Sequence, residues 1–271
     1  MTLYLYGIID SSDPIKESLY GLEGAGVYNV SFCDIGAVVS EISQPIQNVT
    51  EVAILEHETV IEKLMANFVV LPARFQTIID GRDNLRSIMQ SCYKDFKENL
   101  ARVRNRLEFG IKVIWPADKV KENIIQTLKE GRPWPAEPDC SANKRFIRGK
   151  LETYQINEKF KKKANKFIDA MDIFFSKFAA EKKLKRLKTE NLLLDAVYLV
   201  EKNKESDFRD AFEHIKSAHE GFKFLFSGPW PPYNFVILPK KNDLLKESEK
   251  KDLFDKVIQH REPVGAREIW Q

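Results

Sequence analysis

The segment His57-Glu58-Thr59-Val60-Ile61 begins with the residues by which a zinc protease helix holds its metal. In such a helix a second histidine follows four residues after the first, so that both imidazoles reach one zinc ion. Position 61 is isoleucine, so the second ligand is absent. We therefore expect His57 to lie on a helix face beside an exposed Glu58, with no metal bound.

The other groups that could do chemistry do not form a recognisable motif. His214 and His219 are five residues apart, which places them on different helix faces, and we expect both at the surface. Gly21, Gly24 and Gly26 lack the flanking strand and helix of a dinucleotide-binding turn. The sequence contains neither a GxxxxGK[S/T] phosphate loop nor a GxSxG nucleophile turn, although a Ser–His–Asp arrangement assembled by the fold stays open. We expect no enzyme, no catalytic residue and no cofactor.

The cysteines indicate a reducing compartment. Cys33, Cys92 and Cys140 are odd in number, far apart and without CxxC spacing, which is typical of reduced thiols in a cytoplasmic protein. The N-terminus has no basic region and reaches Asp10 early, unlike a secretory signal. The longest uncharged stretch, Phe224–Pro239, has 16 residues with four prolines. A membrane-spanning helix needs roughly 20 apolar residues, so we expect a cytoplasmic protein without a membrane partner.

The charges are unevenly distributed along the chain. The 271 residues are 43% hydrophobic and 31% charged, which excludes wholesale disorder, and their net charge is +3. Residues Lys144–Lys188 carry 15 basic and 5 acidic side chains, a local charge of +10, and the remainder of the chain carries −7. Such a basic block suggests nucleic acid as a partner to be tested.

An apolar seam within this block argues against nucleic acid. The seam residues follow a spacing of 4, 3, 4, 3 and 4: Phe160, Ala164, Phe167, Met171, Phe174 and Phe178. If the aromatic rings lie on a buried seam, the lysines form a solvated outer face, and no ring is left to stack on bases. Two alternatives stay open: an RNA-binding or chaperone-like adaptor that uses helix 144–188, and docking of an acidic partner on the positive face.

The apolar patterns predict an α+β protein of two domains. In the first half we expect strands and helices at Leu3–Ile9, Val27–Phe32, Ala37–Ile42, Thr50–Asn67 (helix), Val69–Leu71, Phe75–Ile79, Asp83–Leu107 (helix) and Phe109–Trp115. In the second half we expect a helix at 118–129, a proline-rich loop at Gly131–Pro138, the basic helix, a strand at Leu192–Val200, a helix at Ser206–Glu220 capped by Ser206 or Asp207, strands at Phe222–Phe226 and Tyr233–Leu238, and a helix at Asp243–Ile258.

These elements predict the following domains. Residues 1–116 form a modified ferredoxin-like α+β sandwich, and residues 117–142 form a helix and a proline-rich linker. Residues 143–258 form a C-terminal α+β domain, a small antiparallel sheet with long helices. Residues 259–271 form a polar tail.

One string is more specific than any other in the sequence. Residues 224–235, Phe-Leu-Phe-Ser-Gly-Pro-Trp-Pro-Pro-Tyr-Asn-Phe, resemble the GPWPPYxF segment of the gas vesicle protein F/L family (GvpF/GvpL). Further segments are similar to that family in order and spacing: Tyr4–Ile8 to its first strand, His57 with Val69–Thr77 to its helix and VLPxRFGT segment, Glu108–Val113 to EWGVKV, and Ala196–Val200 to AYLV. Gln76 replaces the usual glycine and Phe109 the usual tryptophan.

The resemblance implies a non-enzymatic accessory or minor structural protein of gas vesicles, with two α+β domains. It further implies binding to the hydrophobic shell subunit GvpA and to other gas vesicle accessory proteins, a role in assembly, and location in the cytoplasm with the vesicle. A soluble partner would cover shell surface that aggregates when free.

Partner-binding candidates follow from the two most specific segments. They are Pro72, Arg74, Phe75, Trp230, Pro231, Pro232, Tyr233 and Phe235. A proline-rich loop is rigid, and Trp and Tyr are favoured anchors in interfaces. The alternative for the loop is a packed connection whose tryptophan closes the core, and the alternative for Arg74 is a tether between the domains. The seam is either core or a groove for a partner helix.

Overall fold

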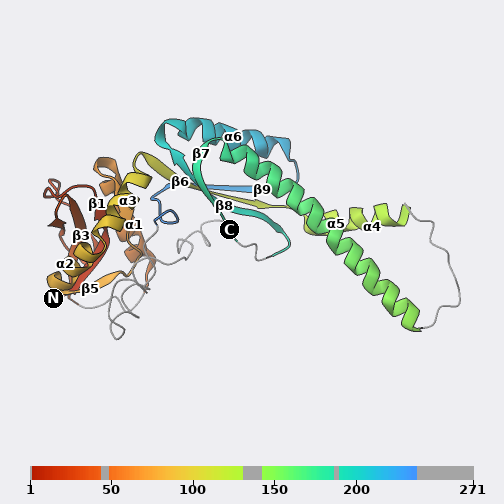
Figure 1. Cartoon of the computed structure of the whole chain (residues 1–271), viewed down its shortest axis with the longest axis horizontal. Coiled ribbons are helices and arrows are strands. Elements are labelled where there is room, and N and C mark those ends of the chain that lie inside the picture. The colour runs from red at the N-terminus through yellow and green to blue at the C-terminus, as the bar shows by residue number, and fades with distance from the viewer. Residues whose placement is uncertain (1, 44–48, 131–141, 186–188, 237–271) are drawn as a thin grey trace. The chain divides into compact units, whose positions relative to one another are not determined.

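The computed structural model describes residues 2–43, 49–130, 142–185 and 189–236 (Figure 1). The chain divides into two compact units, and each is treated by itself. The first unit is Met1–Glu108 together with the segment that begins at Pro229, and the second is Phe109–Gly228. The fold is mixed helix and antiparallel sheet, which confirms the α+β class.

The first unit is built on one antiparallel sheet. Its strands are β1 (Thr2–Ile9), β2 (Val27–Phe32), β3 (Ile35–Ile42), β4 (Val70–Pro72) and β5 (Ile78–Asp80). The order is β2-β3-β1-β4, with β5 also paired to β1. The connection from β1 to β2 contains only the short 3-10 turn η1 (Leu22–Gly24), where a ferredoxin-like unit has a helix.

Helices cover both faces of this sheet, so β1 is buried on both sides. Leu3 and Leu5 pack with α2 (Gly81–Ser91) and α3 (Tyr93–Val103). Tyr4 and Tyr6 pack on the other face with α1 (Glu51–Asn67), whose N-cap Thr50 accepts from the Ala53 amide. The pairing of β1 with β3 shifts register between Leu5 and Gly7, and this bulge places Ile8 on the same side as the leucines.

The second unit has a four-stranded sheet. Its order is β7-β8-β6-β9, and its elements are β6 (Arg106–Ile114), α4 (Ala117–Glu130), α5 (Ala142–Ser176), β7 (Ala179–Leu184), β8 (Leu192–Glu201), η2 (Lys202–Lys204), α6 (Glu205–Ala218) and β9 (Lys223–Trp230). Helices α5 and α6 pack side by side against the sheet (Figure 1). An aromatic core joins them to it: Phe109, Phe175, Tyr198, Phe208 and Phe226.

The predicted seam of α5 is only partly enclosed. Phe160 and Met171 are buried, and the other four seam residues are half-buried. Phe175, outside the predicted seam, is fully buried between Tyr198 and Phe208.

Several predicted boundaries differ from the structure. The helix expected at Asp83–Leu107 is two helices, because the backbone at Cys92 leaves helical geometry at φ −104° and ψ 9°. Strand β7 was not predicted, and β9 continues past Phe226 to Trp230. Helix α6 begins at Glu205 after Lys204, instead of being capped by Ser206 or Asp207.

Some expected segments lie outside the described residues. The two units also divide the chain at other positions than the sequence suggested. The loop Gly131–Pro138, the helix Asp243–Ile258 and the tail 259–271 are not described. The chain crosses between the units within β6 and again near the end of β9, whereas the sequence suggested domains of 1–116 and 143–258. Among the described residues, no helix combines the length and apolar character that crossing a bilayer requires.

Candidate partner-binding site

A buried hydrogen-bond network joins Tyr4 and His57 to the segment that contains Arg74 and Phe75. The Tyr4 hydroxyl lies 3.0 Å from His57 Nδ1, and His57 Nε2 lies 3.2 Å from the Ala73 carbonyl oxygen. A carbonyl can only accept, so Nε2 carries the proton and Tyr4 donates to Nδ1. The Gln76 amide donates to the Tyr4 oxygen at 2.9 Å. Both ring nitrogens of His57 are thus used within the protein.

His57 lies on a face of α1, as the sequence suggested, and that face is buried. Its side chain is fully buried, and burial lowers its pKa to about 4, so the imidazole is neutral near pH 7. The rings of Tyr4, Tyr6 and Phe75 contact it. His57 acts as a packing and hydrogen-bonding residue of the first unit.

Glu58 is less accessible than the exposed residue that the sequence suggested. It is half-buried, and the Tyr233 hydroxyl donates to its Oε1 at 2.9 Å. Burial raises the pKa of this carboxyl, and the hydrogen bond from Tyr233 acts in the opposite direction. Its second oxygen, Oε2, is buried and has no hydrogen-bond partner within the described part of the chain.

The GPWPPYNF string fastens the returning chain to the first unit. The Asn234 amide donates to the Glu108 carboxylate at 2.8 Å, and the Asn234 side-chain amide donates to the other carboxylate oxygen. Phe235 is fully buried, and Val236 joins the core on the α2–α3 side of the sheet. The second half of the most specific string is therefore anchored in the first unit by buried contacts.

This placement changes the list of accessible candidates. Pro72, Pro231, Pro232 and Phe235 are buried, so a partner cannot reach these side chains in this conformation. The half-buried candidates are Arg74, Phe75, Trp230 and Tyr233, and the Tyr233 hydroxyl is bonded to Glu58.

The turn after Arg74 survives the loss of the family's glycine. Gln76 has a φ of 66°, in the left-handed region that favours glycine. The Thr77 amide and hydroxyl both donate to the Arg74 carbonyl, at 3.1 and 2.8 Å. These bonds, with that from the Gln76 amide to Tyr4, hold a conformation that glutamine alone would disfavour.

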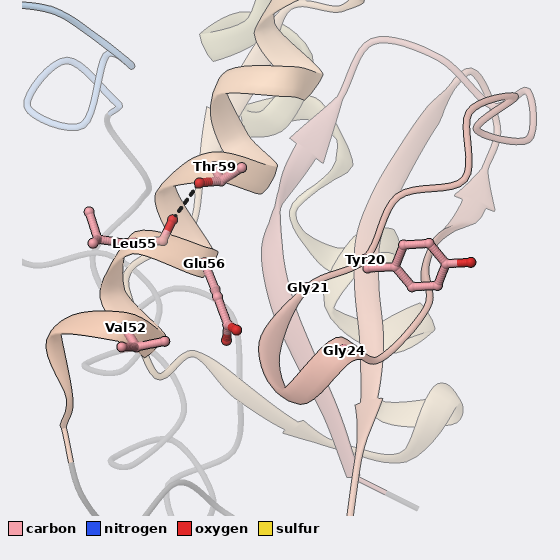
Figure 2. A pocket seen from close by; sticks show the side chains of 7 residues that line it. All are labelled: Tyr20, Gly21, Gly24, Val52, Leu55, Glu56 and Thr59. Atoms are coloured by element: carbon pink, nitrogen blue, oxygen red, sulfur yellow. Dashed lines mark hydrogen bonds between the residues drawn. The ribbon is translucent and has the colours of Figure 1, made fainter.

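An exposed apolar groove lies elsewhere on the first unit. It is an open cavity of about 360 Å³ between the first turns of α1 and the loop before β2. Its lining residues are Tyr20, Gly21, Gly24, Val52, Leu55, Glu56 and Thr59 (Figure 2). Tyr20, Val52 and Leu55 are 66%, 65% and 57% exposed, which is unusual for large apolar side chains. We call these seven residues the α1 groove.

The buried Tyr6 hydroxyl shapes the loop side of the α1 groove. The Leu22 amide donates to it at 3.0 Å, and a Cβ at Gly21 would lie 1.9 Å from it. Gly21 is therefore required for close approach. Glu23 and Gly24 follow with φ of 55° and 71°, which turns the chain back toward β2.

The α1 groove has an acidic edge. Figure 2 shows Glu56 pointing from α1 toward the loop, where its carboxylate accepts from the Glu23 amide at 3.4 Å. Glu23 and Glu51 are exposed nearby, on the loop and on the first turn of α1. In the part of the chain that the structure describes, no lysine or arginine lines the cavity. The groove suits an apolar segment that carries positive charge.

The sequence did not reveal this groove. Leu55 and Val52 both point outward from α1. The only available signal was that Val52 and Leu55 lie three residues apart, off the His57–Ile61–Leu64 face.

The remaining histidines do not gather with other metal-ligating side chains in the described part of the chain. Within the described ranges, no three His, Cys, Asp or Glu side chains gather to hold a metal ion. His214 is exposed as expected, but His219 is partly buried against Phe222.

Comparisons with known proteins agree with the sequence motifs. The family described as "Gas vesicle synthesis protein GvpL/GvpF" matches residues 2–237. Gas vesicle protein F2 of Halobacterium salinarum is 26% identical over 238 residues, which cover 86% of this chain and 91% of the relative. Gas vesicle protein L1 of the same organism is 25% identical over 255 residues, covering 86% and 89%.

Solved structures share the fold. The crystal structure of GvpF from Anabaena sp. PCC7120 superimposes with a TM-score of 0.76 at 23% identity and covers 88% of this chain and 99% of that one. GvpF from Microcystis aeruginosa gives a TM-score of 0.71 at 20% identity, with the same coverage. Because the family match spans nearly the whole sequence, this chain belongs to the gas vesicle GvpL/GvpF family.

Proposed function

We propose that this protein binds the hydrophobic shell subunit GvpA during gas vesicle assembly, as a non-enzymatic accessory or minor structural component in the cytoplasm. Membership of a gas vesicle family makes a role connected with these vesicles the starting point. The observation that carries the finer proposal is the α1 groove, an open apolar surface with no internal element covering it in the described chain.

The chemistry of the groove suits such a client. A shell subunit that keeps one face dry exposes apolar side chains before it assembles, and these aggregate unless a partner covers them. A shallow groove with Tyr20, Val52 and Leu55 on its walls removes apolar surface from water without enclosing the client permanently. Glu56 at the edge orients a positively charged or N–H-rich end of the bound segment.

Other candidates remain proposed contacts of lesser weight. Phe75 and Trp230 are half-buried aromatic side chains in the first unit, and Arg74 lies next to Phe75. The buried Phe235 and the half-buried Tyr233, bonded to Glu58, support the contact by fixing the returning chain.

Co-expression tests the proposal. The tagged full-length chain is expressed with the shell subunit, with and without other vesicle proteins, and purified under non-denaturing conditions. Retention of the shell subunit is the expected result, with less of it in the aggregated fraction. No association in either setting would refute the proposal.

A further inference from the structure

Exposed apolar side chains concentrate in two places. Of the ten large apolar residues that are exposed in the described part of the chain, three line the α1 groove: Tyr20, Val52 and Leu55. Four more lie at the start of α5: Phe146, Ile147, Leu151 and Tyr154. We call the second group the α5 tip. Singly exposed apolar residues are ordinary, but grouped ones indicate interaction surfaces.

The α5 tip forms one helical surface. Ile147, Leu151 and Tyr154 are spaced by four and three residues, so they share a face, and Phe146 adjoins it. Their exposed fractions are between 53% and 65%. Figure 1 shows this end of α5 extending beyond the strands of its own sheet, so the packing that encloses Met171 and Phe175 does not reach it.

The two patches carry opposite charge. The α5 tip is interspersed in the sequence with the basic residues Lys144, Arg145, Arg148 and Lys150 and with one acidic residue, Glu152. The Lys150 ammonium lies 4.8 Å from the centre of the Phe146 ring, so charge and apolar surface are interleaved. The groove instead presents Glu56, with Glu23 and Glu51 nearby. Both patches therefore offer apolar surface, and their charges are opposite in sign.

We propose that the α1 groove of one molecule takes the α5 tip of a second copy of this chain. The tip is a helix with apolar anchors at i, i+4 and i+7, the pattern by which a helix occupies an apolar groove. Ile147 and Leu151 enter the groove against Val52 and Leu55, and the basic residues of the tip face Glu23, Glu51 and Glu56. Burying both surfaces removes seven exposed apolar side chains from water.

The contact joins two different surfaces, so it is heterologous. An open assembly has a free groove at one end and a free tip at the other, so association continues into short chains or closes into rings, depending on concentration. Because the tip occupies the groove, self-association and shell binding exclude each other. The self-contact itself involves this chain alone and stands whether or not the shell subunit binds.

Sedimentation velocity of the purified full-length chain tests the proposal over a concentration series without any shell subunit. Ile147→Glu inserts a charge into the tip, and Ile173→Glu is a matched control on the same helix, with exposed fractions of 65% and 63%. Leu55→Glu damages the groove. We expect concentration-dependent association that weakens with added salt, a rise in the apparent Kd of at least about tenfold for Ile147→Glu and Leu55→Glu, and no change for Ile173→Glu. Far-ultraviolet circular dichroism checks that each variant is folded.

Mixing the two damaged variants gives the sharper result. Ile147→Glu keeps an intact groove, and Leu55→Glu keeps an intact tip, so together they should form a dimer that grows no further. A monomer at every concentration, or association that neither substitution weakens, would overturn the proposal. So would association that nuclease treatment abolishes, because the tip would then be an RNA-binding surface.

Discussion

The amide of Asn234 donates a hydrogen bond to the carboxylate of Glu108 at 2.8 Å, across a separation of 126 residues. Glu108 is 3% exposed, and the side-chain amide of Asn234 binds its second oxygen. One carboxylate thus holds the residue between Tyr233 and Phe235, where the chain returns to the first unit. The two family segments around Glu108 and Asn234 are therefore joined by these hydrogen bonds.

Replacing Glu108 by alanine should remove both hydrogen bonds to Asn234 and destabilise the first unit. The half-buried donors of Asn234 would lose the Glu108 carboxylate, and hydrogen bonds to a charged group contribute about 1.5–3 kcal/mol of unfolding free energy. Urea denaturation measures the change, with Glu98→Ala as a control because the Glu98 side chain is 65% exposed and its pair with Lys94 contributes about 0–1 kcal/mol. Equal effects of the two substitutions would contradict the structural role of Glu108.

A methyl group at Gly21 should disturb the loop side of the α1 groove. Its Cβ would lie 1.9 Å from the Tyr6 oxygen, so either the loop or the tyrosine must move. We expect Gly21→Ala to lower the unfolding free energy by about 1–3 kcal/mol. Gly26→Ala is the matched control, because a Cβ there meets no atom within 4 Å. Thermal unfolding compares them, and similar melting temperatures would argue against the close approach at Gly21.

His57 should make the protein less stable in acid. Burial lowers its folded pKa to about 4, below the value near 6.5 of the unfolded chain. Between these values the unfolded state binds more protons, so the unfolding free energy falls as the pH falls, by up to about 1.4 kcal/mol per pH unit. NMR of the ring protons should show a neutral His57 from pH 8 down to pH 5. Protonation of the folded protein above pH 6 would be the contrary result.

Glu58 should affect the pH dependence of stability in the direction opposite to His57. Burial raises its folded pKa above the ordinary value, so the folded state binds the proton more tightly. Its effect on stability is most favourable below about pH 4.3 and is lost as the pH rises through the folded pKa. Glu58→Gln, which still offers Tyr233 an oxygen, should therefore gain stability relative to the parent between pH 4 and pH 7. Urea denaturation across this range measures the difference in unfolding free energy between Glu58→Gln and the parent. If Glu58 were solvated, that difference would not change with pH.

Local signals predicted the first unit well. The alternating β1, the hairpin of β2 and β3, and the Thr50 cap of α1 all lie within the range that neighbouring residues determine. The break at Cys92 carries no proline or glycine, so the pattern of one continuous apolar face concealed it. Strand β7, with the sequence AAEKKL, has few residues that favour strands and lies at the edge of its sheet.

The candidate site depended on contacts that sequence spacing does not encode. The string around Tyr233 was recognisable, but whether its rings face a partner or the core is decided by Glu58 and Glu108, which lie far away in the chain. The α1 groove arises from a loop with left-handed residues Glu23 and Gly24 beside a helix, and its shape is set by the buried Tyr6. Neither feature has a local signature.

The binding of purified shell subunit to the parent chain, to Leu55→Glu and to Leu184→Glu tests the central claim most directly. Leu55 and Leu184 are 57% and 51% exposed, so both substitutions place the same charge at comparable surface positions, but only Leu55 lines the α1 groove. We expect Leu55→Glu to weaken binding at least about tenfold and Leu184→Glu to bind like the parent, with both variants unfolding at the parent's temperature. Equal binding by all three proteins would contradict a groove-mediated contact with the shell subunit.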